Sequence, residues 1–280
     1  MSVVSDVEEQ LAELRREEAA DGTPDLRTSV MTHVVWAPPK WAPVALKTLA
    51  GLEERHPSRT ILLFPEPQRR DGVETTVSMR CFTLAGLSHE VCSEVIELRL
   101  GGKRSQAPAS IVEPLLISDL PTFCRWRGEP PWGSAQLEQL TGVCDRLVVD
   151  SSEWRGLPGA YAELAGLFER IVVSDIAWGR TREWRGRIAE LWPGIKRAER
   201  LSVTGPKADA LLLAGWLRSR LKRDVTLSHR AAKVVSRITV DGTRVKPPRA
   251  EPLSASDLLS QELDTYTRDP IYEAAVAAAK

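Results

Sequence analysis

The chain has no excess of charge of either sign, because its 280 residues contain 38 Lys and Arg against 38 Asp and Glu. Proteins that bind nucleic acids usually carry a basic excess that neutralises phosphate, so we expect no nucleic acid partner. No apolar run approaches the roughly 20 residues that span a bilayer. The first residues, Met1–Glu9, lack the basic and apolar stretches of a signal peptide. We therefore expect a cytoplasmic protein that makes no contact with a membrane.

Signatures of metal sites and disulfides are also missing. The cysteines are widely spaced and form no C-x-x-C, and the histidines have no metal-ligand spacing. In a reducing compartment such cysteines are typically small buried hydrophobic residues, so we expect free thiols and no metal site. The residues concerned are Cys81, Cys92, Cys124 and Cys144, together with His33, His56, His89 and His229.

The sequence also lacks the common motifs of nucleotide binding and catalysis. It contains neither G-x-x-x-x-G-K-S/T nor a G-x-G-x-x-G after a strand, the loops that hold nucleotide phosphates. The G-x-S-x-G nucleophile elbow and the H-E-x-x-H zinc motif are absent as well. We therefore expect no cofactor and identify no catalytic residue.

The N-terminal half mixes helices with strands of two kinds. Residues 5–18 have apolar residues at helical spacing, with Ser5 and Glu8 as a capping box, and Ala45–Arg55 is a second expected helix. Arg59–Phe64 is a short continuous apolar run, which is typical of a strand covered on both faces. Polar and apolar residues alternate in Val73–Thr83 and Ser93–Leu100, which favours antiparallel pairing. The remaining expected strand is Ser29–Trp36.

The C-terminal half alternates strands with helices, which predicts βαβ units and a parallel sheet. The expected strands are Thr122–Arg127, Arg146–Asp150, Arg170–Ser174 and Arg200–Thr204. The expected helices are 134–141, 158–169, 181–192 and 207–221. Beyond them, Thr226–Val240 is expected to enter a hairpin that turns at Asp241-Gly242, and 246–252 is a proline-rich linker before two final helices at 257–263 and 270–279.

These patterns predict an α/β fold with a mostly parallel sheet flanked by helices and an antiparallel portion in the N-terminal half. We expect an N-terminal helical arm at 1–25, an α/β domain at 26–155, and a second α/β domain with terminal helices at 156–280.

Small polar residues follow the expected parallel strands, where ligand sites of such sheets are found. They are Asp150 with Ser151, and Ser174 with Asp175. Asp150, Ser174 and Asp175 are therefore candidates for lining a polar cleft. Aspartate and serine at strand exits also cap the following helix, and this simpler interpretation is favoured for each residue alone.

The other unusual segment combines tryptophan and arginine, the residue types most enriched at binding hot spots. Seven of the nine tryptophans lie between Trp126 and Trp216. The candidate residues for binding a partner are Trp178, Arg180, Arg182, Trp184 and Arg185. Each tryptophan is equally consistent with a core position, and Trp184 lies inside an expected helix, which favours the core for it.

Seven segments resemble the glucose-6-phosphate dehydrogenase assembly protein (OpcA) family, in the order in which that family has them. They are Arg27–Val35, His56–Leu63, Pro114–Gly128, Arg146–Ser151, Asp175–Arg185, Leu213–Trp216 and Leu259–Glu273.

The resemblance implies a partner protein of glucose-6-phosphate dehydrogenase, the enzyme that opens the oxidative pentose phosphate pathway. Such a protein promotes the assembly of the enzyme or activates it allosterically, and is not itself an enzyme. In some members of the family cysteines confer redox control, but none of the four cysteines here matches such a motif. The alternative is a sensor or enzyme that binds a small molecule, such as a sugar phosphate, in the cleft at the carboxyl edge of the sheet.

Overall fold

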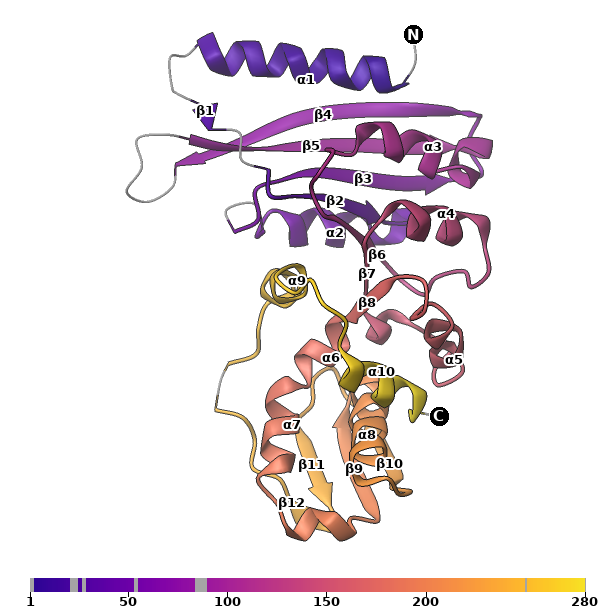
Figure 1. Ribbon diagram of the computed structural model, residues 1–280, viewed down its shortest axis with the longest axis vertical. Helices are drawn as coiled ribbons and strands as arrows, with labels where there is room; N and C mark the ends of the chain where they lie inside the picture. Colours follow the sequence, from indigo (N-terminus) through magenta and orange to yellow (C-terminus); the bar gives the residue numbers. More distant parts are fainter. Residues whose placement is uncertain are drawn as a thin grey trace. The chain divides into compact units, whose positions relative to one another are not determined.

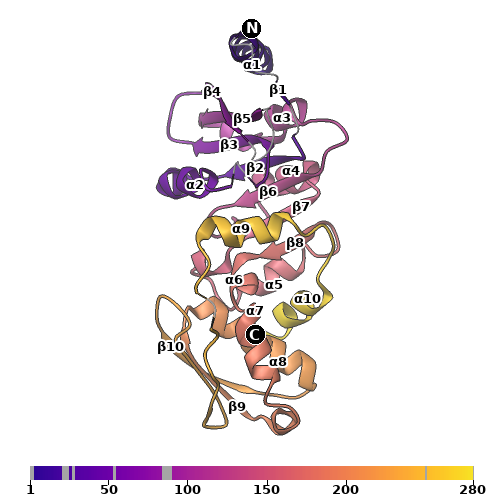
Figure 2. The same ribbon diagram turned by 90° about the vertical axis from the view of Figure 1, so that its left-hand side faces the viewer.

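The computed structural model describes residues 3–20, 25–26, 29–52, 55–83, 90–249 and 251–279, so His89 lies outside the described residues. The chain divides into two compact units, Met1–Val148 and Val149–Lys280, and each is described by itself below. Figures 1 and 2 show the elements of each unit in two views.

The first unit contributes the strands β1 to β7 to a sheet that confirms the expected mostly parallel arrangement. Its strand order is β1-β5-β3-β2-β6-β7, and these neighbours pair in parallel. Strand β4 pairs with β5 along its full length in the antiparallel direction, as the alternating patterns predict. The strands are β1 (Asp25–Leu26), β2 (Met31–Trp36), β3 (Ser58–Glu66), β4 (Gly72–Thr83), β5 (Glu90–Gly101), β6 (Thr122–Trp126) and β7 (Arg146–Val149).

The central strands are apolar runs because both of their faces are covered. All residues of β2 and β6 are buried, as are all but the last residue of β3. The indole rings of Trp36 and Trp126 stack with centroids 5.0 Å apart. Burial and the nearby charge of Arg125 lower the pKa of His33 to about 3, so this histidine is a neutral core residue.

Helix α1 (Val3–Ala20) lies along β4 (Figure 1) and packs more firmly than its narrow apolar stripe suggests. Val7 and Leu11 are fully buried, and Arg15 forms an ion pair with Glu94 of β5. The helix begins before Ser5, so the expected capping box at Ser5 is wrong. The other helices of the unit are α2 (Ala42–Leu49), α3 (Ala109–Val112) and α4 (Ala135–Val143).

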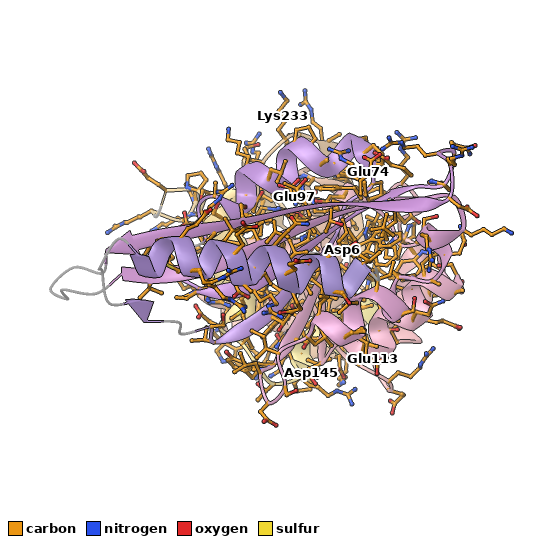
Figure 3. All side chains as sticks on the ribbon, turned by 90° about the horizontal axis from the view of Figure 1, so that it is seen from above. Asp6, Glu74, Glu97, Glu113, Asp145 and Lys233 are labelled. Carbon is orange, nitrogen blue, oxygen red and sulfur yellow. A yellow bond between two sulfur atoms is a disulfide. The ribbon has the colours of Figure 1, made fainter. Side chains whose placement is uncertain are left out.

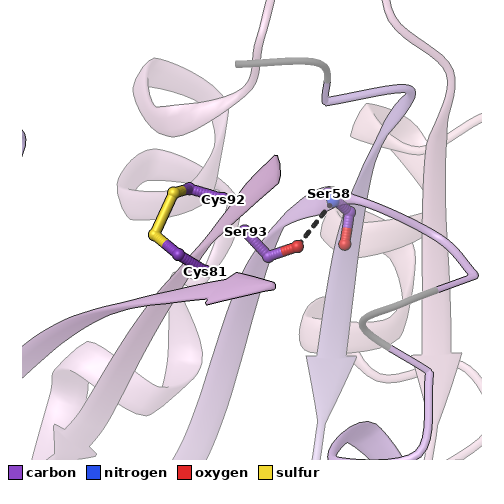
Figure 4. Close-up of a disulfide and its surroundings, with 4 residues drawn as sticks. All are labelled: Ser58, Cys81, Cys92 and Ser93. Atoms are coloured by element: carbon purple, nitrogen blue, oxygen red, sulfur yellow. Dashed lines mark hydrogen bonds between the residues drawn. A yellow bond between two sulfur atoms is a disulfide. The ribbon is translucent and has the colours of Figure 1, made fainter. Parts of the chain in front are cut away.

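A disulfide joins Cys81 and Cys92, so the expectation of four free thiols is wrong for this pair (Figure 4). The two residues lie directly opposite each other on the antiparallel strands β4 and β5, with Cα atoms 4.1 Å apart. Their spacing in sequence is set by the register of the two strands, which no cysteine motif describes. Cys124 and Cys144 are free and buried, as expected.

Reduction of this disulfide is expected to lower the free energy of unfolding by roughly 3 kcal/mol, because the crosslink closes a short loop in the unfolded chain. Its cysteines are 11 residues apart. The measurement is urea denaturation with and without dithiothreitol. The matched control is Cys81→Ser/Cys92→Ser, whose midpoint should not respond to the reductant. An identical response of both proteins would show that the crosslink does not stabilise the fold.

The second unit has its own four-stranded sheet, ordered β10-β9-β11-β12. Strand β9 (Arg200–Gly205) pairs in parallel with β10 (Thr226–Ala231) and antiparallel with β11 (Arg237–Val240). The expected membership of Arg200–Thr204 in the large parallel sheet is therefore wrong. Buried and more exposed residues alternate along β9, because one face of this smaller sheet is open. In β7, by contrast, every residue is buried. As expected, the turn at Asp241 and Gly242 leads from β11 to β12 (Thr243–Arg244), and both turn residues have positive φ.

Helices α7 and α8 share one apolar core with the inner face of this sheet (Figure 1). Trp184 and Ile188 of α7 and Leu213 of α8 belong to it, with Leu201 and Ile238 of the strands. Further elements are β8 (Val172–Asp175), α5 (Ala160–Ala165), α6 (Ile176–Arg180), α7 (Arg182–Ala189), α8 (Lys207–Leu221), α9 (Ala255–Leu263) and α10 (Pro270–Ala277).

Helices α8 and α10 meet with their backbones in close contact at Gly215. A Cβ atom placed on this residue would lie 2.1 Å from the main-chain oxygen of Ala275. Only glycine permits that approach, which explains a glycine in the middle of this helix.

Candidate functional site

Two of the candidate cleft residues cap short helical elements of the second unit. The side chain of Asp150 accepts a hydrogen bond from the amide of Ser152 at the start of a 3-10 turn (Ser151–Glu153). The side chain of Asp175 caps α6 by accepting from the amide of Ala177 at 2.9 Å. The simpler interpretation of both residues therefore matches their local structure.

The carboxylate of Asp175 is fully buried. It accepts a second hydrogen bond, from the amide of Ser151 at 3.0 Å, and so ties the ends of two successive strands together. Burial, and then the charge of Asp150, raise the pKa of Asp175 to about 7. Ser174 is also buried. The three candidate residues are thus close together, but Ser174 and Asp175 are enclosed by protein.

Arg180 connects these carboxylates to α8. Its Nε and Nη2 atoms donate to the two oxygens of Asp209 at 3.0 and 2.9 Å, and Nη2 lies 3.4 Å from Asp150. Asp209 has no exposed surface. Burial disfavours the charge of Arg180, but its bonds to Asp209 and the charge of Asp150 outweigh this and raise the pKa of Arg180. The arrangement is a bidentate ion pair between α6 and α8, in which the carboxylate is buried and the guanidinium is partly exposed.

Two tyrosines complete the cluster. The hydroxyl of Tyr161 lies 3.0 Å from Ser151 Oγ, and burial followed by the charge of Asp175 raises the pKa of Tyr161. The same two causes raise the pKa of Tyr272 on α10. The cluster joins α5, α6, α8 and α10 through groups that are capped, paired or buried, which is the arrangement of a structural core.

The two tryptophans among the candidate partner-binding residues lie in the interior of the unit. Trp178 is 6% exposed and its Nε1 donates to Asp269 at 2.8 Å, while Trp184 is 7% exposed. The guanidinium of Arg185 stacks on Trp178 with its carbon 3.4 Å from the ring centroid. Burial lowers the pKa of Arg185 to about 10. Of the five candidates, Arg182 is the one classed as exposed.

Sequence reasoning missed three features of this region. Asp209, in the first turn of α8, was not identified as a site residue. An acidic residue directly before the apolar run Ala210–Ala214 does indicate a buried partner. Tyr161 and Tyr272 come from helices distant in sequence. Trp192 is 60% exposed and has Lys196 4.4 Å from its ring centroid, whereas the expected helix 181–192 included this residue. Pro193 directly after it was the signal that the helix ends earlier.

Ionisation of Asp175 is expected to make the protein less stable as the pH rises from about 4 to about 7. The folded pKa is raised to about 7, whereas an aspartate in the unfolded chain titrates near ~3.9. Between these values the folded state binds more protons, so the free energy of unfolding falls as the pH rises. Asp175→Asn keeps an oxygen for the two amides and removes this titration.

The measurement is urea denaturation of the wild-type chain and Asp175→Asn at several pH values from about 4 to about 8. The stability of the variant relative to the wild type should increase up to about pH 7 and then level off. A difference that stays constant across this range would show that Asp175 titrates as an ordinary carboxyl.

Among the residues that the structure describes, no group of three or more His, Cys, Asp or Glu side chains could hold a metal ion. None of the helices in the described ranges is long and apolar enough to cross a membrane.

Two protein-family models match the chain, and they describe two domains of the same protein. Residues 50–166 match the model described as the N-terminal domain of the "Glucose-6-phosphate dehydrogenase subunit". Residues 171–251 match the model described as the C-terminal domain of that same protein. The two matches follow each other along the chain and together cover more than half of it.

Three curated relatives of the chain carry the same name. The chain is 30% identical over 179 residues to the protein named "Putative OxPP cycle protein OpcA" from Nostoc punctiforme, a match that covers 60% of this chain and 38% of the relative. Proteins of the same name from Synechococcus elongatus and Synechocystis are 25% and 26% identical, over 60% of this chain and 40% and 38% of their own lengths. The chain thus spans about two fifths of the length of the curated relatives it matches.

Proposed function

Because the chain belongs to the OpcA family, we propose that it binds glucose-6-phosphate dehydrogenase and promotes the assembly or activity of that enzyme without performing chemistry itself. The observation that carries the proposal is the pair of consecutive matches to the two dehydrogenase-related domains, one largely in each unit. The relatives named for the oxidative pentose phosphate cycle support the same partner. We place this role in the cytoplasm, together with the enzyme.

The geometry of the candidate site supports a binding protein more than a catalyst. An acid or base in catalysis must reach the substrate, but Asp175 and Asp209 have no exposed surface and Arg180 is committed to two carboxylates. A sugar phosphate at this edge would have to displace those bonds. The contacts that these described residues make therefore do not favour the alternative of a metabolite sensor or enzyme there.

We expect the purified chain to form a complex with the host's own dehydrogenase and to raise its kcat/KM or shift its oligomeric state. Size-exclusion chromatography with light scattering reports the complex, and steady-state kinetics report the activation. The chain alone, incubated with glucose 6-phosphate and NADP, serves as the control for intrinsic activity. Separate elution together with unchanged kinetics would exclude the assignment, and turnover by the chain alone would make it an enzyme.

A further inference from the structure

One region of the second unit has an excess of basic residues over acidic ones. Residues 226–249 contain six Lys and Arg and one acidic residue, although the whole chain is neutral. That acid, Asp241, accepts hydrogen bonds from the amides of Glu199 and Arg200 and is thus occupied by the backbone. This region supplies three of the four strands of the smaller sheet.

Strand register places most of this charge on the outer face of the sheet. In one row Arg230 and Arg237 flank Thr204, and in the next row Ser228, Ser202, Thr239 and Arg244 lie side by side. The neighbouring residues Leu201, Val203, Ile238 and Val240 point to the other face and are buried in the core. The face opposite the core therefore consists of arginines and hydroxyl groups.

The four arginines of this outer face are free to meet a ligand. Arg200, Arg230, Arg237 and Arg244 are exposed, and no ion pair involves them within the described part of the chain. Adjacent strands lie about 4.8 Å apart, so the main chains of Arg230 and Arg237, two strands apart, are separated by about 10 Å. Each guanidinium can hold a separate carboxylate in bidentate geometry.

An ordinary solvated face does not account for this composition. Solvent-facing surfaces usually mix both signs of charge and are rich in lysine and glutamate, whereas arginine is enriched at interfaces and lysine is depleted there. Arg230 on the edge strand β10 could serve to prevent strand pairing between molecules. Arg200 and Arg237 lie on strands that have neighbours on both sides and need no such protection.

The shape of the face indicates a protein partner. Its hollow, lined by Arg230, Arg237, Val203 and four hydroxyl side chains, has a volume of only about 160 Å³. Pockets for small molecules are typically larger, roughly 300–1,000 Å³, and mostly apolar. Val234 is 56% exposed in the loop beside the arginines, and the side chain of Lys233 in the same loop points away from the ribbon (Figure 3). Arginines next to an exposed apolar side chain are typical of a protein interface.

We propose that the outer face of the β10-β9-β11-β12 sheet is the docking surface for an acidic segment of the partner protein. The proposal rests on the proposed function, which makes that partner glucose-6-phosphate dehydrogenase. Carboxylates of the partner pair with Arg230 and Arg237, and the hydroxyl groups between them donate further hydrogen bonds.

The test compares Arg230→Thr/Arg237→Thr with the wild-type chain in binding to the host's dehydrogenase at low and high NaCl. Threonine suits an exposed strand and matches the neighbouring hydroxyl groups, so the melting temperature should not change. We expect the double variant to weaken binding on the order of tenfold or more at low salt and to reduce its salt dependence. Lys103→Thr/Arg104→Thr, on an exposed turn of the first unit, removes the same charge and should bind as the wild type does.

Binding by the double variant that equals the wild type at both salt concentrations would overturn this docking surface while leaving the proposed function intact. Failure of the wild-type chain to bind the dehydrogenase would overturn both proposals. A short DNA duplex is the probe for the other polyanion. If the arginine pair controls binding of the duplex but not of the enzyme, the face takes nucleic acid and the proposal is wrong.

Discussion

Trp178→Ala is expected to lower the free energy of unfolding by about 3–5 kcal/mol, because it removes a large side chain from a packed interior. The indole lies 5.7 Å from the ring of Tyr272 and bonds Asp269, the residue that caps α10. Truncation leaves a cavity, deprives Asp269 of a donor, and takes away the surface on which Arg185 stacks. Urea denaturation and the melting temperature measure the loss.

Trp192→Ala is the matched control, since it removes the same side chain from a position that is 60% exposed. Its effect on stability should be no more than about 1 kcal/mol, from the lost contact with Lys196. If Trp178→Ala kept the stability of the wild type and weakened dehydrogenase binding instead, Trp178 would be an interface residue and its burial would be wrong.

Arg180→Met is expected to destabilise the protein by about 3–5 kcal/mol, because it leaves a buried carboxylate without its partner. Burial and the charge of Asp150 already raise the pKa of Asp209, so without Arg180 this carboxyl group would have to bind a proton or carry an unpaired charge in a site without solvent. Charge reversal at Arg180 is therefore no clean test of partner binding, and Arg182 is the residue of that segment where such a test can be made.

The double variant Arg180→Met/Asp209→Leu separates charge from packing. It replaces the ion pair by two apolar side chains, so it should recover much of the stability that Arg180→Met loses. Stability measurements on the two single variants and the double variant give the coupling energy of the pair. A double variant no more stable than Arg180→Met alone would show that the arginine acts through packing and not through its charge.

The parts of the fold that could be predicted are those where local pattern and burial coincide. The apolar run of β3 predicted a strand covered on both faces, and the alternation in β4 and β5 predicted their antiparallel pairing. Strand β9 was assigned to the wrong sheet because the order of helices and strands does not say which strands pair. Its polar and apolar residues alternate in Arg200–Thr204, and that alternation was the available sign of a strand with one open face.

The position of the candidate site could be predicted from the sequence, but the interactions between its residues could not. Asp150 and Asp175 do lie together, because the ends of successive strands meet. Their partners Arg180 and Asp209 could not be inferred, since the pairing depends on how α8 packs in three dimensions. The same limit applies to Cys81 and Cys92, whose contact follows from a register that the sequence does not state. The outer arginine face depends on positions in four strands, and it could be recognised only once the order of these strands was known.

The position of β2 in the large sheet has a consequence for how the protein is made. One side of β2 pairs with β3, which follows it closely in the chain. The other side pairs with β6, which is synthesised much later. Before β6 is synthesised, β2 has unpaired amides and carbonyls along one edge, although it is fully buried in the folded protein. Such an open strand edge can pair with other chains and so promotes aggregation. Long-range pairing of this type also slows folding. We therefore expect the nascent chain to be prone to aggregation in the interval between the emergence of Trp36 and that of Trp126 from the ribosome.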